Sequence, residues 1–271
     1  MVAPFFFPDV MILIAENLTV TNPAVARALR ERDPAPLRVV AEQAVAAGAA
    51  YLDLNLGAGR WGRGEALSFA LEVLSECWTG GLLADTADPA VMDQVSRGWT
   101  GEVVLNGYSG DSGREAVLEV AADQGLDVVV LLMAQGIPPG SDDRLALAAE
   151  LAGDCEARGV SVDRLWFDPM VAPLGWIDGQ EYNRALVETL RGLPGVFGAP
   201  VRTLLGLSNL TTAAASVRRV PWLQQVFLAL AAGAGLTHVL ADVCDPGIVR
   251  VVRALEVFHG ERLYAAAELD G

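Results

Sequence analysis

The chain has 271 residues, 52% of them hydrophobic and 20% charged, with a formal net charge of −15. This acidic balance argues against a nucleic acid or an anionic membrane surface as a partner, because both require an extended basic face. All 19 basic residues are arginines, and the absence of lysine excludes Schiff-base enzymes and P-loop nucleotide enzymes, which need a lysine amine.

The length and the apolar content predict one globular domain of α/β-barrel size over residues 1–271, in a cytoplasmic protein. The apolar start lacks a basic segment and a cleavage site and is interrupted by Pro4, Pro8 and Asp9, so we expect a buried strand there and no membrane span. Three scattered cysteines and two histidines are too few for a disulfide framework or a metal centre held by the protein.

Short runs of Val, Ile and Leu alternate along the chain with segments of helical periodicity, joined by short turns. Helical segments include 36–49, 65–76, 143–159 and 221–235. Strands are expected at 10–15, 50–55, 80–85, 102–107, 127–133, 164–169, 203–208 and 237–242. Eight strand–helix repeats in a chain of this length predict a (β/α)₈ TIM barrel.

Polar side chains end seven of the eight expected strands; only the fifth, which ends near Met133, lacks one. In a parallel barrel the carboxyl ends of the strands meet at one mouth, where active sites are built. Any one of these residues could instead cap a helix or close a turn, and for Asp242 alone that structural role is the better interpretation. As a set they predict a polar site at the mouth: Glu16, Asp53, Asn55, Asp85, Asn106, Asp168, Ser208, Asn209 and Asp242.

The segment GAGRWG, residues 57–62, has the G-x-G-x-x-G spacing of a dinucleotide-binding loop. A Rossmann strand before such a loop is continuously apolar, whereas Asp53 and Asn55 alternate here with leucines. This alternation is typical of a barrel strand with polar groups in the lumen. An NAD(P)-binding oxidoreductase is therefore the weaker alternative, and we do not expect NAD(P) or flavins to bind.

Several segments resemble successive blocks of the methyltetrahydrofolate:corrinoid methyltransferases, from about Met11 to about Phe258. The most specific are GLSN and the DP-x-x-x-P block; AAGAAYLDLNLG, LLADTADP, VVLNGYSG and GIPPGSDDRLALAAELA are further matches. That family belongs to the pterin-binding enzymes, with dihydropteroate synthase and the folate domain of cobalamin-dependent methionine synthase. The resemblance implies a pterin-binding TIM barrel, commonly a homodimer, that moves the N5-methyl group of methyltetrahydrofolate to or from the cobalt of a corrinoid (cobalamin) carried by a partner protein.

The resemblance also implies roles for single residues. Asp85, Asn106 and Asp168 are expected to hold the pterin with Gly206 and Ser208, while Asn209 lies near N5 and acts in catalysis with Asp85. The chemistry agrees, because carboxylates and an amide complement the N–H donors and the carbonyl of an aminopyrimidinone. Either Arg218 or Arg219 corresponds to a family arginine, and Tyr108 and the loop after Asn209 depart from the family pattern.

Two further alternatives stay open. A dihydropteroate synthase shares the barrel and the pterin site, but resembles proteins with a lysine and a Ser-x-Arg near the last strand, where this chain has LADVCDP. A non-catalytic pterin-binding subunit would bind the folate without transferring its methyl group. The sequence leaves the corrinoid partner, the pathway and the direction of transfer undecided.

Overall fold

A computed structural model describes residues 11–57, 64–212, 220–258 and 260. Eight parallel strands follow one another around a closed barrel in chain order, as the sequence predicts. The strands are β1 (Ile12–Ala15), β2 (Tyr51–Leu54), β3 (Gly81–Asp85), β4 (Val103–Tyr108), β5 (Asp127–Leu131), β6 (Leu165–Asp168), β7 (Arg202–Gly206) and β8 (His238–Ala241). The (β/α)₈ fold class is confirmed.

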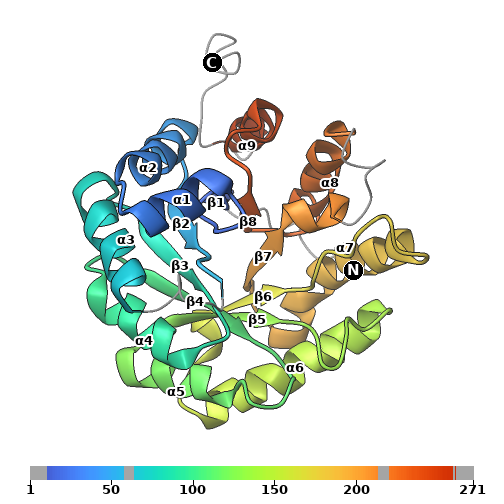
Figure 1. The fold of residues 1–271 in the computed structure, drawn as a ribbon. Helices are drawn as coiled ribbons and strands as arrows, with labels where there is room; N and C mark the ends of the chain where they lie inside the picture. Colours follow the sequence, from blue (N-terminus) through green and yellow to red (C-terminus); the bar gives the residue numbers. More distant parts are fainter. Residues whose placement is uncertain (1–10, 58–63, 213–219, 259, 261–271) are drawn as a thin grey trace.

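Helices surround the strands, with α1 between α2 and β1 and the others in an outer ring (Figure 1). They are α1 (Pro23–Glu31), α2 (Ala35–Ala47), α3 (Gly64–Cys77), α4 (Pro89–Gly98), α5 (Glu115–Gln124), α6 (Ser141–Ala157), α7 (Gly179–Phe197), α8 (Trp222–Ala232) and α9 (Pro246–Phe258). In the described part of the chain, no helix is long and apolar enough to cross a membrane.

Helix α1 is an addition between β1 and α2 that the repeat pattern does not predict. The Asn22 side chain accepts a hydrogen bond from the Ala24 amide at 3.0 Å, and Pro23 begins the helix. Asn at the N-cap followed by Pro is a favoured helix start. Its buried face, which includes Val25 and Leu29, packs on the main core.

Two apolar layers hold the fold together. The larger layer lies between the strands and the helices, and the smaller one fills the barrel interior with side chains that include Ile14, Leu83, Val104, Trp166 and Leu204. Alternate residues of a strand point to opposite faces, so the residues two positions further on also face the interior.

This two-residue period places polar groups above the interior layer. Asp85, Asn106 and Asp168 stand two positions after Leu83, Val104 and Trp166, respectively. Asp85 and Asp168 are the last residues of their strands, and Asn106 lies two residues before the end of β4. The register puts Asp85 beside Asn106 and Asp168 beside Leu131. The barrel is thus apolar in its interior and polar at its mouth.

Candidate functional site

A cavity of about 660 Å³ opens at the carboxyl ends of the strands. Residues from β1 to β8 line it, among them Glu16, Asp53, Asn55, Asp85, Asn106, Asp168, Gly206, Ser208 and Asn209. The strand-end residues are thus brought together, with the exception of Asp242. Thr19, Thr21, Thr211 and Thr212 also line it, and sequence reasoning did not single them out.

The acidic cluster, formed by Glu16, Asp53 and Asp85, occupies one side of this cavity. Burial raises the pKa of Glu16 to about 7, the Ser208 hydroxyl opposes that shift, and the charge of Asp242 adds to it. Burial also raises the pKa of Asp85, against a hydrogen bond from Asn55 and the charge of Arg114. At neutral pH this cluster can both hold and release protons.

Asp53 is the most enclosed member of the acidic cluster, with 3% of its surface exposed. Burial raises its pKa well above the usual range, and the charges of Asp85 and Glu16 raise it further. Among the described residues, none makes a hydrogen bond to its Oδ1 atom. The carboxyl is therefore suited to stay protonated at neutral pH and to donate a hydrogen bond.

Asn55 connects the acidic cluster to the loop after β2 through hydrogen bonds. Its Nδ2 atom donates to Asp85 Oδ2 at 2.6 Å, and its Oδ1 atom accepts from the Gly57 amide at 3.3 Å. Asn55 thereby orients Asp85 toward the cavity. The remaining residues of GAGRWG after Gly57 lie outside the described residues.

Asp168 lies on the opposite side of the mouth, where β6 ends. Its Oδ1 atom accepts a hydrogen bond from the Met170 amide at 2.8 Å, which fixes the carboxyl orientation. Burial raises the pKa of Asp168 to about 7, while that hydrogen bond and the charge of Arg144 act in the other direction. Arg144 is a buried arginine of α6 that no motif in the sequence marks as a site residue.

Asn209 follows β7 in a short 3₁₀ helix (Leu207–Thr211). A side-chain carbon added at Gly206 would lie 3.1 Å from Asn209 Nδ2, so the glycine leaves the space that the amide occupies. Ser208, its neighbour, interacts with the Glu16 carboxyl. The Asn209 amide, which can donate or accept hydrogen bonds, thus lines the same cavity as a carboxyl whose pKa is raised to about 7.

Asp242 is not among the residues that line the cavity. Its Oδ1 atom accepts hydrogen bonds from Asn17 Nδ2 at 2.5 Å and from the Cys244 amide at 2.8 Å. These contacts connect the loop after β1 to the turn after β8, which is the structural role that Asp242 alone suggested. Arg218 and Arg219 lie outside the described residues.

Tyr108 does not line the mouth, although it follows Asn106 by two residues. Its side chain is buried, and its hydroxyl lies 3.1 Å from Asp154 Oδ2 on α6. The strand register shifts between Asn106 and Tyr108, which takes Tyr108 out of the interior-facing alternation. The bulky side chain therefore packs between β4 and α6 and leaves the cavity free.

Comparison with known proteins agrees with this fold. A methylcorrinoid:tetrahydrofolate methyltransferase of Eubacterium limosum is 26% identical over 217 residues, which cover 74% of this chain and 80% of the relative. The dihydropteroate synthase of Vibrio fischeri ES114 superimposes with a TM-score of 0.68 at 18% identity, covering 94% of this chain and 95% of its own.

A second solved structure, the dihydropteroate synthase of Yersinia pestis, has a TM-score of 0.65 at 20% identity and covers 93% of this chain and 95% of its own. At such identities the two structures support the fold alone. The sequence profile of the family described as "Pterin binding enzyme" matches residues 16–241, which extend from the end of β1 to the end of β8. The chain belongs to the family of pterin-binding enzymes.

Proposed function

We propose that this chain transfers the N5-methyl group between methyltetrahydrofolate and the cobalt of a corrinoid protein. The observation that carries the proposal is the convergence of Asp85, Asn106, Asp168 and Asn209 on one cavity in a chain that is similar to a methylcorrinoid:tetrahydrofolate methyltransferase. The cavity volume of about 660 Å³ lies within the 300–1,000 Å³ usual for a site of this kind.

The pterin is held by its hydrogen-bonding edge. An aminopyrimidinone presents an amino group and a ring N–H that suit a carboxylate, and a carbonyl that suits an amide N–H. Asp168 and Asp85 supply carboxyls on opposite sides of the mouth, and Asn106 supplies the amide beside Asp85. This arrangement fixes the ring plane and leaves N5 for Asn209.

Methyl transfer changes the protonation of N5. When the methyl leaves N5, the nitrogen gains a proton, and when a methyl arrives the N–H proton departs. The corrinoid of the partner protein supplies the cobalt atom that accepts or gives the methyl group. In this chain Asn209 donates a hydrogen bond to N5 as the charge on N5 changes. The acidic cluster takes up or supplies the proton, which passes through Ser208.

A dihydropteroate synthase activity is the weaker alternative. The two dihydropteroate synthase structures described above are below 25% identity and so do not transfer their activity. The chain has no lysine, and its segment at the end of β8 reads ADVCDP where dihydropteroate synthases have a Ser-x-Arg. A non-catalytic pterin-binding subunit would bind methyltetrahydrofolate but would not methylate Co(I) cobalamin, which an absorbance assay detects.

Asp168→Ala and Asn106→Ala are each expected to weaken methyltetrahydrofolate binding by about 1–3 kcal/mol, the cost of leaving a donor or acceptor of the ligand unpaired. Isothermal titration calorimetry measures the two affinities. Asp123→Ala, which removes an exposed carboxylate on α5, is the control and should bind as the wild type does. Unchanged affinity in both site variants would remove the proposed pterin site.

We also propose that the chain forms a homodimer through α7 and α8. An apolar groove of about 410 Å³ lies between these helices, and Val226 and Leu230 on α8 are about half exposed at its edge. Arg184, Glu188 and Arg191 line the same groove. A face that carries both signs of charge can be complementary to itself across a two-fold axis.

Leu230→Arg is expected to convert this dimer to a monomer, because it places a charge in the apolar part of the interface. Sedimentation velocity distinguishes the two states. Val45→Arg is a matched control, since Val45 is an apolar residue of α2 that is 59% exposed, close to the 55% of Leu230. A wild-type monomer, or a dimer that persists in Leu230→Arg, would contradict the assignment of this interface.

A further inference from the structure

Arg144, in the first turn of α6, is completely buried. Arginine is almost never fully buried unless its charge is paired. Among the salt bridges of the described residues none includes Arg144, and no described residue lies within hydrogen-bonding range of its Nη2 atom. The burial of this cation therefore needs an explanation, and the groups that surround it provide one.

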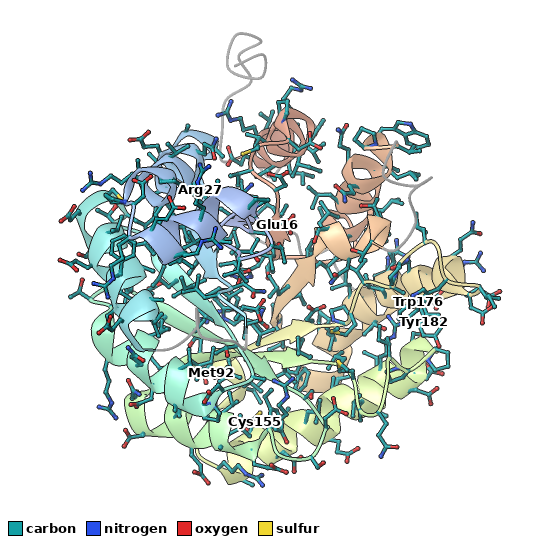
Figure 2. The ribbon with its side chains drawn as sticks, viewed as in Figure 1. Glu16, Arg27, Met92, Cys155, Trp176 and Tyr182 are labelled. Carbon is teal, nitrogen blue, oxygen red and sulfur yellow. The ribbon has the colours of Figure 1, made fainter. Side chains whose placement is uncertain are left out.

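Two loops of the barrel mouth are fastened by this side chain. Arg144 Nε donates to the Pro138 carbonyl at 2.8 Å, in the loop after β5, and Nη1 donates to the Pro169 carbonyl at 3.0 Å, in the loop after β6. The guanidinium also lies 5.8 Å from the centre of the Tyr182 ring on α7. Tyr182 in turn packs edge-on against Trp176, beside which it lies in Figure 2.

The second of these loops follows Asp168, the last residue of β6. Pro169 follows it directly, and Met170, whose amide donates to Asp168 Oδ1, has a φ of +67°. A left-handed backbone is uncommon for a residue with a side chain and persists where the surroundings fix it. The hydrogen bond to Pro169 and the one to Asp168 provide that constraint on either side of the peptide. Met170 lines the cavity, so the shape of this turn is part of the mouth.

The charge of Arg144 also acts on Asp168. Burial raises the pKa of Asp168, and the positive charge of Arg144 opposes that rise. Among the described residues that line the mouth, the other ionisable groups are those of the acidic cluster from β1, β2 and β3. The charge of Arg114 acts on that cluster at Asp85. Tyr182 of α7 acts on Arg144 itself.

We propose that Arg144 is a positioning residue for the pterin. From α6, on the outer side of the barrel, Arg144 holds the Asp168–Met170 turn in place, and its positive charge keeps Asp168 a hydrogen-bond acceptor. This inference rests on the proposed function, because it assigns Asp168 to the pterin edge. A carboxylate accepts from the amino group and the ring N–H of that edge only when it is ionised. Affinity should therefore fall as the pH drops through the pKa of Asp168.

The test is the methyltetrahydrofolate affinity of the full chain between pH 5.5 and 9, by calorimetry, for the wild type, Arg144→Gln and Arg144→Lys. In Arg144→Gln the pH midpoint of binding should rise by about one unit, which makes binding about tenfold weaker on the acid side of the midpoint, and the deficit should shrink toward pH 9. Arg144→Lys keeps the charge and should keep the wild-type midpoint.

An equal loss of affinity at every pH in Arg144→Gln would overturn the inference, since it would show a purely structural role. So would a midpoint that moves as far in Arg144→Lys as in Arg144→Gln. The folate-free protein gives an independent readout, because the carboxyl signal of Asp168 can be titrated by ¹³C NMR, with Asp168→Asn identifying the signal.

The pKa of Asp168 should be higher in Arg144→Gln than in the wild type, and an unchanged value overturns the inference. A wild type that binds no folate but shows this pKa change would instead contradict the proposed function and leave the interaction between Arg144 and Asp168 intact. The two failures are thereby distinguished.

Discussion

Asn209→Ala is expected to slow methyl transfer to Co(I) cobalamin by about 10²-fold or more, while methyltetrahydrofolate binding weakens much less. The reason is that Asn209 acts on charge that develops at N5, so the interaction reaches full strength only in the transition state. Removing such an interaction lowers kcat with little change in ground-state affinity. The measurement is single-turnover transfer at saturating folate, followed by the loss of the Co(I) absorbance.

The surroundings of Asn209 provide a control for this result. Gly206 leaves the space beside the amide, and Thr212, the first residue after the 3₁₀ helix that carries Asn209, lines the same cavity from an exposed position. Thr212→Ala should therefore transfer the methyl group at nearly the wild-type rate. If Asn209→Ala binds poorly but transfers normally once saturated, Asn209 only binds the pterin, and the activation of N5 belongs to the acidic cluster.

The barrel could be predicted because its signals are local. Each strand is a short apolar run. In the second strand, Asp53 and Asn55 alternate with leucines, and this alternation distinguishes a barrel strand with polar groups in the interior from a Rossmann strand, which is continuously apolar. All eight expected strands are present, with boundaries that differ by at most two residues. The positions of Asp168 and Asn106 at the mouth follow from the two-residue period of a strand, since each stands two positions after an interior apolar residue.

The parts that could not be predicted depend on long-range contacts. Arg144 stands in a polar first turn of α6, where an arginine normally faces solvent, and only the tertiary fold shows that it reaches Pro138 and Pro169. Asp242 ends its strand as the site residues do, but Asn17, which is distant in the sequence, engages its carboxyl. Tyr108 does not face the interior because the strand register shifts after Asn106, and no local sequence pattern predicts that shift.

Asp53 differs from the other carboxyls of the mouth because it is the least exposed of them and has an oxygen without a hydrogen-bond partner among the described residues. Its raised pKa means that the folded state binds the proton more tightly than the unfolded state does. Its contribution to stability is therefore lost as the pH rises from about 4, the unfolded value, toward the folded pKa. The wild type should be less stable at pH 8 than at pH 5.5.

Asp53→Asn should therefore be more stable than the wild type at pH 8, by on the order of 1–3 kcal/mol, and this gain should shrink toward pH 5.5. The amide keeps the shape of the side chain but cannot carry the N5 proton, so methyl transfer should slow by about 10²-fold. Denaturant titrations at the two pH values and single-turnover transfer measure the two effects, with Asp123→Asn as the control for a lost surface carboxylate.

Transfer at the wild-type rate would place the proton on Glu16 or Asp85, and a loss of stability at pH 8 would show that Asp53 is ionised and stabilising. A variant that gains stability and loses activity would mean that the chain keeps a destabilising buried carboxyl because methyl transfer requires it.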